Sequence, residues 1–208
     1  IFIGYDMDEI DGKIIKYREC KTDQDKVSYH IVTDKTSFYP EGGGQIGDIG
    51  QIILGDKKIK VNNTFRDAGE IIHVTIELPN DLNSLIKLKI DRNRRTLIES
   101  NHTSTHLLHQ ALRKILGDHV EQRGSMISDK MFRFDFSHQN KISDSELSNV
   151  NNFVNEKINE SIDLIEDREE DYQIATKNGA IGLFTEKYED KVRTCLLYTS
   201  DAADEEDS

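Results

Sequence analysis

The chain has 208 residues, with 27 Lys and Arg against 39 Asp and Glu, a net charge of −12, two Cys and no Trp. Its apolar runs are only a few residues long, which excludes a transmembrane helix, and two distant cysteines exclude a disulfide framework. This composition predicts a soluble chain in a reducing, cytoplasmic compartment, with no membrane or DNA partner. At first sight the net charge argues against a generic nucleic-acid-binding protein.

The charge is unevenly distributed. Basic residues concentrate between Arg92 and Arg133, whereas residues 195–208 carry several Asp and Glu and no Lys or Arg. The net charge of the whole chain therefore describes no single face of the protein.

The first ninety residues predict a series of short strands. Apolar and polar residues alternate in 29–34, and the segments 51–54 and 58–61 flank Gly55 and Asp56, a pair typical of a hairpin turn. Two more such segments follow, at 70–76 and 86–90. Short strands in succession favour a small β-barrel or a sandwich, and we assign the barrel to residues 1–91.

The pattern changes after Asp91. Apolar residues recur three or four apart from Arg94 to Leu116, which predicts a helix ended by Gly117. The later elements expected are a strand at 131–136, a helix opened by the capping box at 143–146, a strand at 162–165 and a helix at 169–177. The chain is therefore predicted to be α+β, with an α+β domain over residues 92–194.

Two histidines four residues apart are the sharpest chemical feature. On a helix, His102 and His106 would share a face, and two neutral imidazoles can hold one Zn²⁺ ion. Zinc suits hydrolysis because it polarises a carbonyl or activates water. Thr103 stands where zinc proteases of the His-Glu-x-x-His type require Glu. The spacing supplies half of a metal site, and the alternative that both histidines simply lie on a helix face stays open.

Glycines 42 to 44 form a second feature. Gly42, Gly43 and Gly44 precede Gln45, and such a run lets the backbone adopt positive φ and approach a ligand closely. The run lacks the Gly-Lys-Ser/Thr ending of a phosphate-binding P-loop, so a tight turn is the simpler interpretation. Gln122 is either a loop residue or a polar residue that reads a substrate.

Taken in order, these motifs resemble the editing region of alanyl-tRNA synthetases. The resemblance rests on seven segments and covers nearly all of the chain from Phe2 to about Thr194: residues 2–6, 36–48, 94–109, 111–113, 117–125, 133–138 and 179–188. It implies the editing fold shared with threonyl-tRNA synthetases, the second additional domain of those enzymes.

The resemblance also implies an activity. This region would hydrolyse mischarged Ser-tRNA(Ala) or Gly-tRNA(Ala), while the parent enzyme attaches alanine to tRNA(Ala) with ATP at a site outside this chain. Editing is needed because one methyl group is worth only about 1–3 kcal/mol of discrimination. By the matching motifs, His102 and His106 would bind zinc, and Thr105 and Gln122 would be catalytic pocket residues.

The tRNA would be held at its acceptor end. The resemblance implies that the turn at Gly42, Gly43 and Gly44 approaches that end. The cluster of positive charge at the start of the helix would contact phosphates through Arg92, Arg94 and Arg95.

The family pattern breaks near the end of the chain. Alanyl-tRNA synthetases carry a downstream Cys-x-x-x-His that completes the zinc site, but Cys195 is followed four residues later by Thr199. We interpret residues 195–208 as a non-native acidic read-through, with a native disordered tail as the alternative. The expectation is a fragment cut at both ends, with two of four zinc ligands, that alone binds zinc weakly and deacylates poorly.

Two other hypotheses remain. The chain could be a free-standing trans-editing deacylase. It could also be a metal-free tRNA-binding module, whose affinity would depend on salt and would not change in the His102→Ala variant. The sequence gives no oligomeric state and no preference between Ser and Gly.

Overall fold

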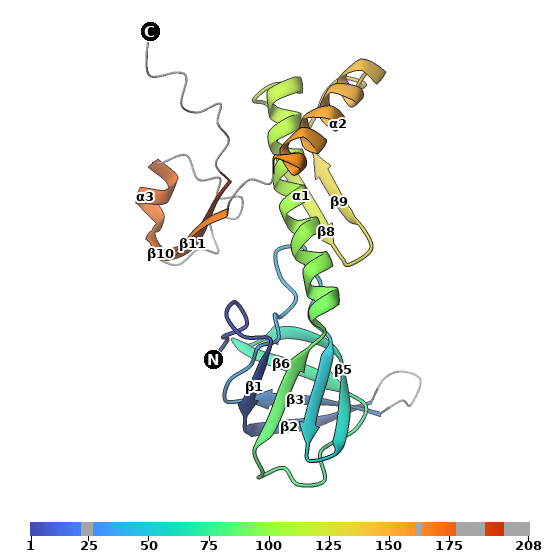
Figure 1. Ribbon diagram of the computed structural model, residues 1–208, viewed down its shortest axis with the longest axis vertical. Helices are drawn as coiled ribbons and strands as arrows, with labels where there is room; N and C mark the ends of the chain where they lie inside the picture. Colours follow the sequence, from blue (N-terminus) through green and yellow to red (C-terminus); the bar gives the residue numbers. More distant parts are fainter. Residues whose placement is uncertain (22–26, 161–163, 178–189, 198–208) are drawn as a thin grey trace. The chain divides into compact units, whose positions relative to one another are not determined.

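Seven antiparallel strands form one curled sheet in the computed structural model (Figure 1). The structure describes residues 1–21, 27–160, 164–177 and 190–197. The order across the sheet is β1-β7-β4-β5-β6-β3-β2. The strands are β1 (Glu9–Gly12), β2 (Ile14–Lys21), β3 (Val27–Thr33), β4 (Gly50–Leu54), β5 (Lys57–Asp67), β6 (Glu70–Thr75) and β7 (Ile86–Ile90).

The predicted barrel is confirmed only as a curled, open sheet. Strands β1 and β2 lie at opposite edges and are not hydrogen-bonded to each other, so the sheet is a half-barrel. Most residues of β2 are exposed, from Ile15 through Glu19. A strand without a buried face gains little from pairing on its free edge, which is why closure is not favoured.

Alternation along the strands builds the core. In β7 the residues Ile86, Leu88 and Ile90 are buried and the lysines between them are more accessible. The same period of two buries Ile59 and Val61 in β5. These side chains cover one face of the sheet and pack with others into a single apolar cluster: Ile10, Ile31, Phe38, Ile52, Ile59, Val61, Ile86, Leu88 and Ile90.

Helix α1 (Arg92–Leu116) follows β7 directly, which confirms the predicted helix. Asp91 caps its start, because its carboxylate accepts a hydrogen bond from the backbone N–H of Arg94 at 3.1 Å. The helix ends at Gly117, whose φ of 115° lies outside the range that other residues adopt easily.

The remaining elements follow α1 in the chain. Strands β8 (Gln122–Ile127) and β9 (Phe132–Phe136) pair with each other. Helix α2 (Asp144–Asn159) begins at the predicted capping box, in which Ser143 and Glu146 satisfy each other's backbone N–H groups. Strand β10 (Leu164–Asp171) pairs antiparallel with β11 (Lys191–Leu197), and the short helix α3 (Tyr172–Lys177) lies between them in the chain. The α+β class is thus confirmed.

The helix predicted at 169–177 begins three residues late. Residues 169–171 belong to β10, where Glu170 and Asp171 lie opposite Val192 and Lys191 of β11. The Asp171 carboxylate accepts from the backbone N–H of Gln173 at 2.8 Å and so caps α3. Pairing with a distant strand overrides the local preference of these acidic residues.

Other predictions fall partly or wholly outside the described residues. Of the strand expected at 162–165, Leu164 and Ile165 lie in β10 and the other two residues are outside. Residues 195–197 belong to β11, whereas 198–208 and the motif at 179–188 lie outside the described residues. Among helices of the described part, none combines the length and apolar content needed to cross a bilayer.

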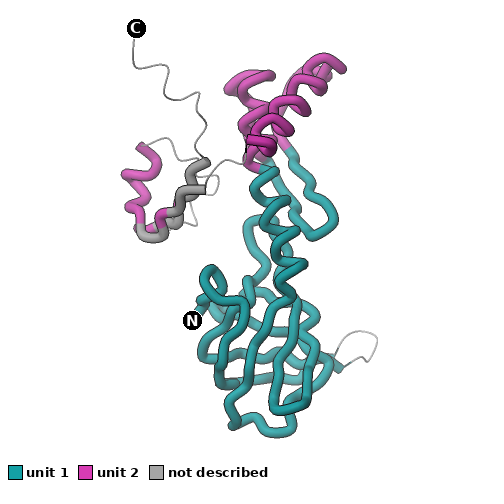
Figure 2. The backbone as a smooth tube through the Cα atoms, in the orientation of Figure 1, with its two compact units in different colours: residues 1–105, 123–135 teal, residues 106–122, 136–208 magenta. Residues whose placement is uncertain are grey.

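Two compact units make up the chain, residues 1–105 with 123–135, and residues 106–122 with 136–208 (Figure 2). The domain boundary predicted between residues 91 and 92 lies where the sheet ends and helix α1 begins, and not at a boundary between the two units. As a division into domains it stays a prediction.

Candidate functional site

Helix α1 carries six of the predicted site residues, three arginines at its start and three residues farther along. His102 is half-buried, Thr105 is 4% exposed and His106 is exposed. Because the helix is uninterrupted from Arg92 to Leu116, its local geometry places residues four apart on one side. The spacing of the two histidines therefore has the helical context that the zinc hypothesis requires.

The glycine run is the predicted tight turn. Gly42 and Gln45 exchange two backbone hydrogen bonds of 3.0 Å, and between them Gly43 and Gly44 have φ of 60° and 84°. A Cβ atom on Gly44 would lie 2.3 Å from Ser125 Oγ and 2.6 Å from Ser125 O. Glycine is thus needed at Gly44 both for its conformation and for this close approach.

Backbone hydrogen bonds hold the turn on strand β8. The Ile127 N–H donates to Gly44 O at 2.7 Å, and the Ile46 N–H donates to Ile127 O at 3.1 Å. These two bonds form a parallel bridge between Gln45 and Ile127. The glycine turn is therefore a fixed part of the first unit rather than a loop held only at its ends.

Gln45 connects this turn to the helix. Its side-chain Oε1 lies 2.7 Å from Nδ1 of His102, and the residue is only 5% exposed. The structure thus brings together two motifs that the sequence places 57 residues apart. Sequence reasoning assigned Gln45 no role; its position next to the glycine run was the available signal.

The Thr105 hydroxyl is engaged by its own helix. It donates to Asn101 O at 2.8 Å, a bond common for Thr inside helices. Asn101 in turn donates from its side-chain Nδ2 to Ser128 O at 2.8 Å, next to the end of β8. The predicted pocket role of Thr105 stays a prediction.

The three arginines at the start of α1 differ in environment. Arg92 is exposed and pairs with Asp8 at 3.3 Å and Glu99 at 3.0 Å. Arg94 is half-buried, donates to Gly47 O at 2.9 Å and pairs with Asp129 at 3.3 Å. The side chain of Arg92 is 49% exposed and that of Arg94 only 16%, and the phosphate contacts predicted for both stay predictions.

Arg95 is a buried anchor. Only 3% of the residue is exposed, and its Nε donates to the Asp48 carboxylate at 3.0 Å. Its two other nitrogens donate to backbone carbonyls, Nη1 to Gly4 O at 3.0 Å and Nη2 to Ser37 O at 3.1 Å. Burial alone would lower the pKa of Arg95, but the hydrogen bonds and charge of Asp48 outweigh it and raise that pKa. This placement disfavours the predicted phosphate contact at Arg95.

The second unit holds His106 and Gln122. Desolvation, followed by the neighbouring His109 imidazole, lowers the pKa of His106. A lowered pKa favours the neutral imidazole, which is the form that metal ions bind. Gln122 is the first residue of β8 and is half-buried. Its predicted role in the pocket stays a prediction.

The residues fit part of a zinc site. If Gln45 Oε1 accepts from His102 Nδ1–H, the lone pair of that imidazole lies on Nε2, the arrangement usual for histidine ligands. Among the described residues, no group of three or more His, Cys, Asp and Glu side chains could hold a metal ion. The described part of the chain therefore offers two ligands at most, and zinc binding stays a prediction.

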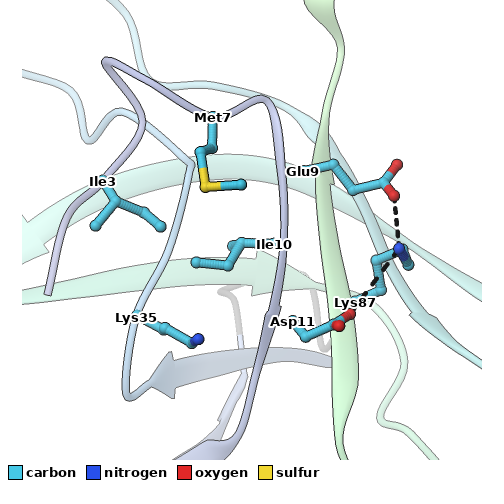
Figure 3. Close-up of a pocket in the computed structure, with 7 residues that line it drawn as sticks. All are labelled: Ile3, Met7, Glu9, Ile10, Asp11, Lys35 and Lys87. Carbon is cyan, nitrogen blue, oxygen red and sulfur yellow. Dashed lines mark hydrogen bonds and ion pairs between the residues drawn. The ribbon is translucent and has the colours of Figure 1, made fainter.

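A surface hollow lies elsewhere in the first unit (Figure 3). Ile3, Met7 and Ile10 line it together with charged side chains, among which Lys87 pairs with Glu9 at 2.6 Å. None of its lining residues belongs to the predicted site. The candidate site is therefore the contact of the glycine turn, strand β8 and helix α1.

Comparison with known proteins agrees with the motifs. Residues 1–94 match the family model described as class II (A) tRNA synthetases. The chain is 48% identical over 192 residues to an alanine--tRNA ligase from Cytophaga hutchinsonii and 47% identical over 193 residues to one from Christiangramia forsetii. A third, from Parabacteroides distasonis, is 45% identical over 192 residues.

These matches cover 92% of the chain but only 22% of each ligase. The resemblance seen in the motifs is thus confirmed: over most of its length, the chain is related in sequence to one segment of the alanine--tRNA ligases.

Proposed function

We propose that this chain is an editing segment that hydrolyses Ser-tRNA(Ala) and Gly-tRNA(Ala), within a parent ligase that attaches alanine to tRNA(Ala) with ATP. One observation carries the proposal. The buried side chain of Gln45, in the glycine turn, contacts His102 of the His-x-x-x-His helix at 2.7 Å. Two motifs that the resemblance assigns to one site therefore meet in the folded chain.

The reaction is attack of water on the ester that joins an amino acid to the tRNA. Zinc bound to His102 and His106 would polarise the ester carbonyl or activate water. The protein's own part is positioning. The turn at Gly43 and Gly44 presents backbone without side chains, which suits close approach by the tRNA acceptor end.

Selectivity would come from a second site, which hydrolyses the wrong aminoacyl esters. An alanine site discriminates poorly against glycine, since one methyl is worth about 1–3 kcal/mol. Serine differs from alanine by a hydroxyl, which Thr105 and Gln122 would recognise by hydrogen bonding. Rejection at a second, hydrolytic site multiplies the discrimination of the first.

Binding of the tRNA would be electrostatic in part. Arg92, exposed at the start of α1, and the half-buried Arg94 are the proposed phosphate contacts. Because neutralised phosphates release counterions, the affinity should fall as salt rises. The cytoplasmic location expected from composition stays a prediction.

The test is a chimaera in which the matched segment replaces its counterpart in the Cytophaga hutchinsonii ligase. Preformed Ser-tRNA(Ala) should be hydrolysed faster than Ala-tRNA(Ala), and His102→Ala should slow the hydrolysis at least about a hundredfold. His30→Ala is the matched control: this half-buried histidine of β3 contacts Arg18 and Phe65 and has no part in the proposed site, so the rate should be kept. Alanine attachment reports that the rest of the chimaera is intact.

The alternatives predict different outcomes. A metal-free tRNA-binding module would bind tRNA(Ala) with unchanged affinity after His102→Ala and would hydrolyse neither ester. A free-standing trans-editing deacylase would hydrolyse Ser-tRNA(Ala) as the isolated 208-residue chain at the rate of the chimaera. Unchanged hydrolysis by the His102→Ala chimaera would contradict the proposed site.

A further inference from the structure

We propose that Gln45 is a positioning residue that holds His102 in the Nδ1–H tautomer, with its lone pair on Nε2. The use of that lone pair for zinc rests on the proposed function. The tautomer itself does not, because it follows from contacts within the first unit. Nothing in the motif matches assigns Gln45 to this role.

The contact fixes which nitrogen carries the proton. A neutral imidazole has one N–H donor and one lone pair, and the partner of one nitrogen decides the state of the other. Gln45 Oε1 is an acceptor only, and it lies 2.7 Å from His102 Nδ1. With the amide oxygen facing the ring, the proton is on Nδ1 and the lone pair on Nε2.

The acceptor is held rigidly. The backbone N–H and C=O of Gln45 are both paired with Gly42 at 3.0 Å, and its neighbours Gly44 and Ile46 are both bonded to Ile127 of β8. Only 5% of Gln45 is exposed, so water competes little for its amide. A fixed, buried acceptor orients the ring more strongly than a mobile surface amide would.

The opposite arrangement is a definite alternative. If the amide were turned so that its NH₂ group faced His102, it would donate to Nδ1, and the proton would lie on Nε2. That imidazole could not offer Nε2 to a metal ion without first changing tautomer. The two arrangements thus differ in an observable property of the metal-free chain.

The experiment is long-range ¹H–¹⁵N NMR on the metal-free, ¹⁵N-labelled 208-residue chain at pH 8, with His102 assigned by its loss in His102→Asn. The wild type should show the Nδ1–H tautomer at His102. Gln45→Glu, which keeps an acceptor, should preserve it, and Gln45→Met should abolish the preference. Gln51→Met, at an exposed glutamine of β4, is the matched control and should leave the spectrum of His102 unchanged.

A zinc titration of the same samples separates the two proposals. Loss of an orienting partner typically weakens metal binding about 10- to 100-fold, so Gln45→Met should bind Zn²⁺ more weakly than wild type by that factor. An Nε2–H tautomer in the wild type, or an unchanged tautomer in a folded Gln45→Met variant, would overturn the positioning role. An Nδ1–H tautomer with no response to Zn²⁺ would uphold that role and contradict the zinc part of the proposed function.

Discussion

The interior of the curled sheet and the middle of helix α1 each contain a histidine whose Nδ1 lies against an oxygen atom. In the sheet, His73 Nδ1 lies 3.0 Å from Ile31 O, and its Nε2 lies 2.8 Å from the hydroxyl of Thr36. A carbonyl only accepts, so Nδ1 of His73 carries the proton and Nε2 accepts from Thr36. At the helix, Gln45 takes the place of the backbone carbonyl beside His102.

The two histidines differ in burial and in the kind of acceptor. His73 is 0% exposed and both of its nitrogens are used inside the sheet, so it stabilises the fold and offers nothing to a ligand. His102 is half-buried and its acceptor is a side chain from a turn. The same kind of contact thus completes a core in one region and orients a half-buried side chain in the other.

The largest expected effect is on the buried ion pair at the edge of the sheet region. Arg95→Ala leaves Asp48, which is 2% exposed, as an uncompensated buried charge. The free energy of unfolding should fall by about 3–5 kcal/mol, measured by urea denaturation. Arg92→Ala, at an exposed pair, should cost no more than about 1 kcal/mol. Equal losses would contradict the buried role of Arg95.

The next prediction is that His73 makes the free energy of unfolding depend on pH. Burial lowers the pKa of His73 to about 4, from an ordinary value of 6.5 in the unfolded chain. The unfolded state therefore binds a proton first as pH falls, so stability is full above pH 6.5 and decreases toward pH 4. The loss should reach about 3 kcal/mol, since each unit of pKa corresponds to about 1.4 kcal/mol.

Two measurements check this prediction. Urea unfolding at a series of pH values gives the loss, and NMR titration of His73 in the native chain should show no protonation until the pH is close to 4. A His73 resonance that titrates near 6.5 in the folded state would contradict its buried, doubly bonded placement.

The smallest single effect expected is that of Gly43→Ala, in the turn that carries Gln45. A Cβ atom on Gly43 would have no neighbour within 4 Å. Gly43→Ala should therefore lower the free energy of unfolding only through its positive φ, by about 1–2 kcal/mol. Gly44→Ala adds a clash with Ser125 and should cost about 1–3 kcal/mol more. Thermal unfolding of the two variants compares them. If the two were equally stable, the fixed position of this turn on β8 would be wrong.

Local signals predicted much of the fold. The alternation at 86–90 matches β7, the capping box at Ser143 begins α2, and Gly117 ends α1. Strands β1 and β2 were missed because residues 9–21 are crowded with charged side chains that hide any alternation. They become strands through distant partners, as where Glu9 lies opposite Lys89 and Tyr17 opposite Ile31.

The candidate site was predicted less completely. The spacing of His102 and His106 identified the helix, and the glycines identified the turn, because both signals are local. The contact of Gln45 with His102 and the burial of Arg95 against Asp48 join residues 57 and 47 apart. A charged residue such as Arg95 is expected at the surface unless its partner is known, so sequence reasoning placed it among the phosphate contacts.

The most direct measurement of the central claim compares both histidines in one sample. Long-range ¹H–¹⁵N spectra of the wild-type chain should show the Nδ1–H tautomer at His73 and at His102. Addition of millimolar Zn²⁺ should then shift the Nε2 resonance of His102 and leave that of His73 unchanged. A spectrum in which His102 carries its proton on Nε2, or in which Zn²⁺ leaves both histidines unchanged, would contradict the account.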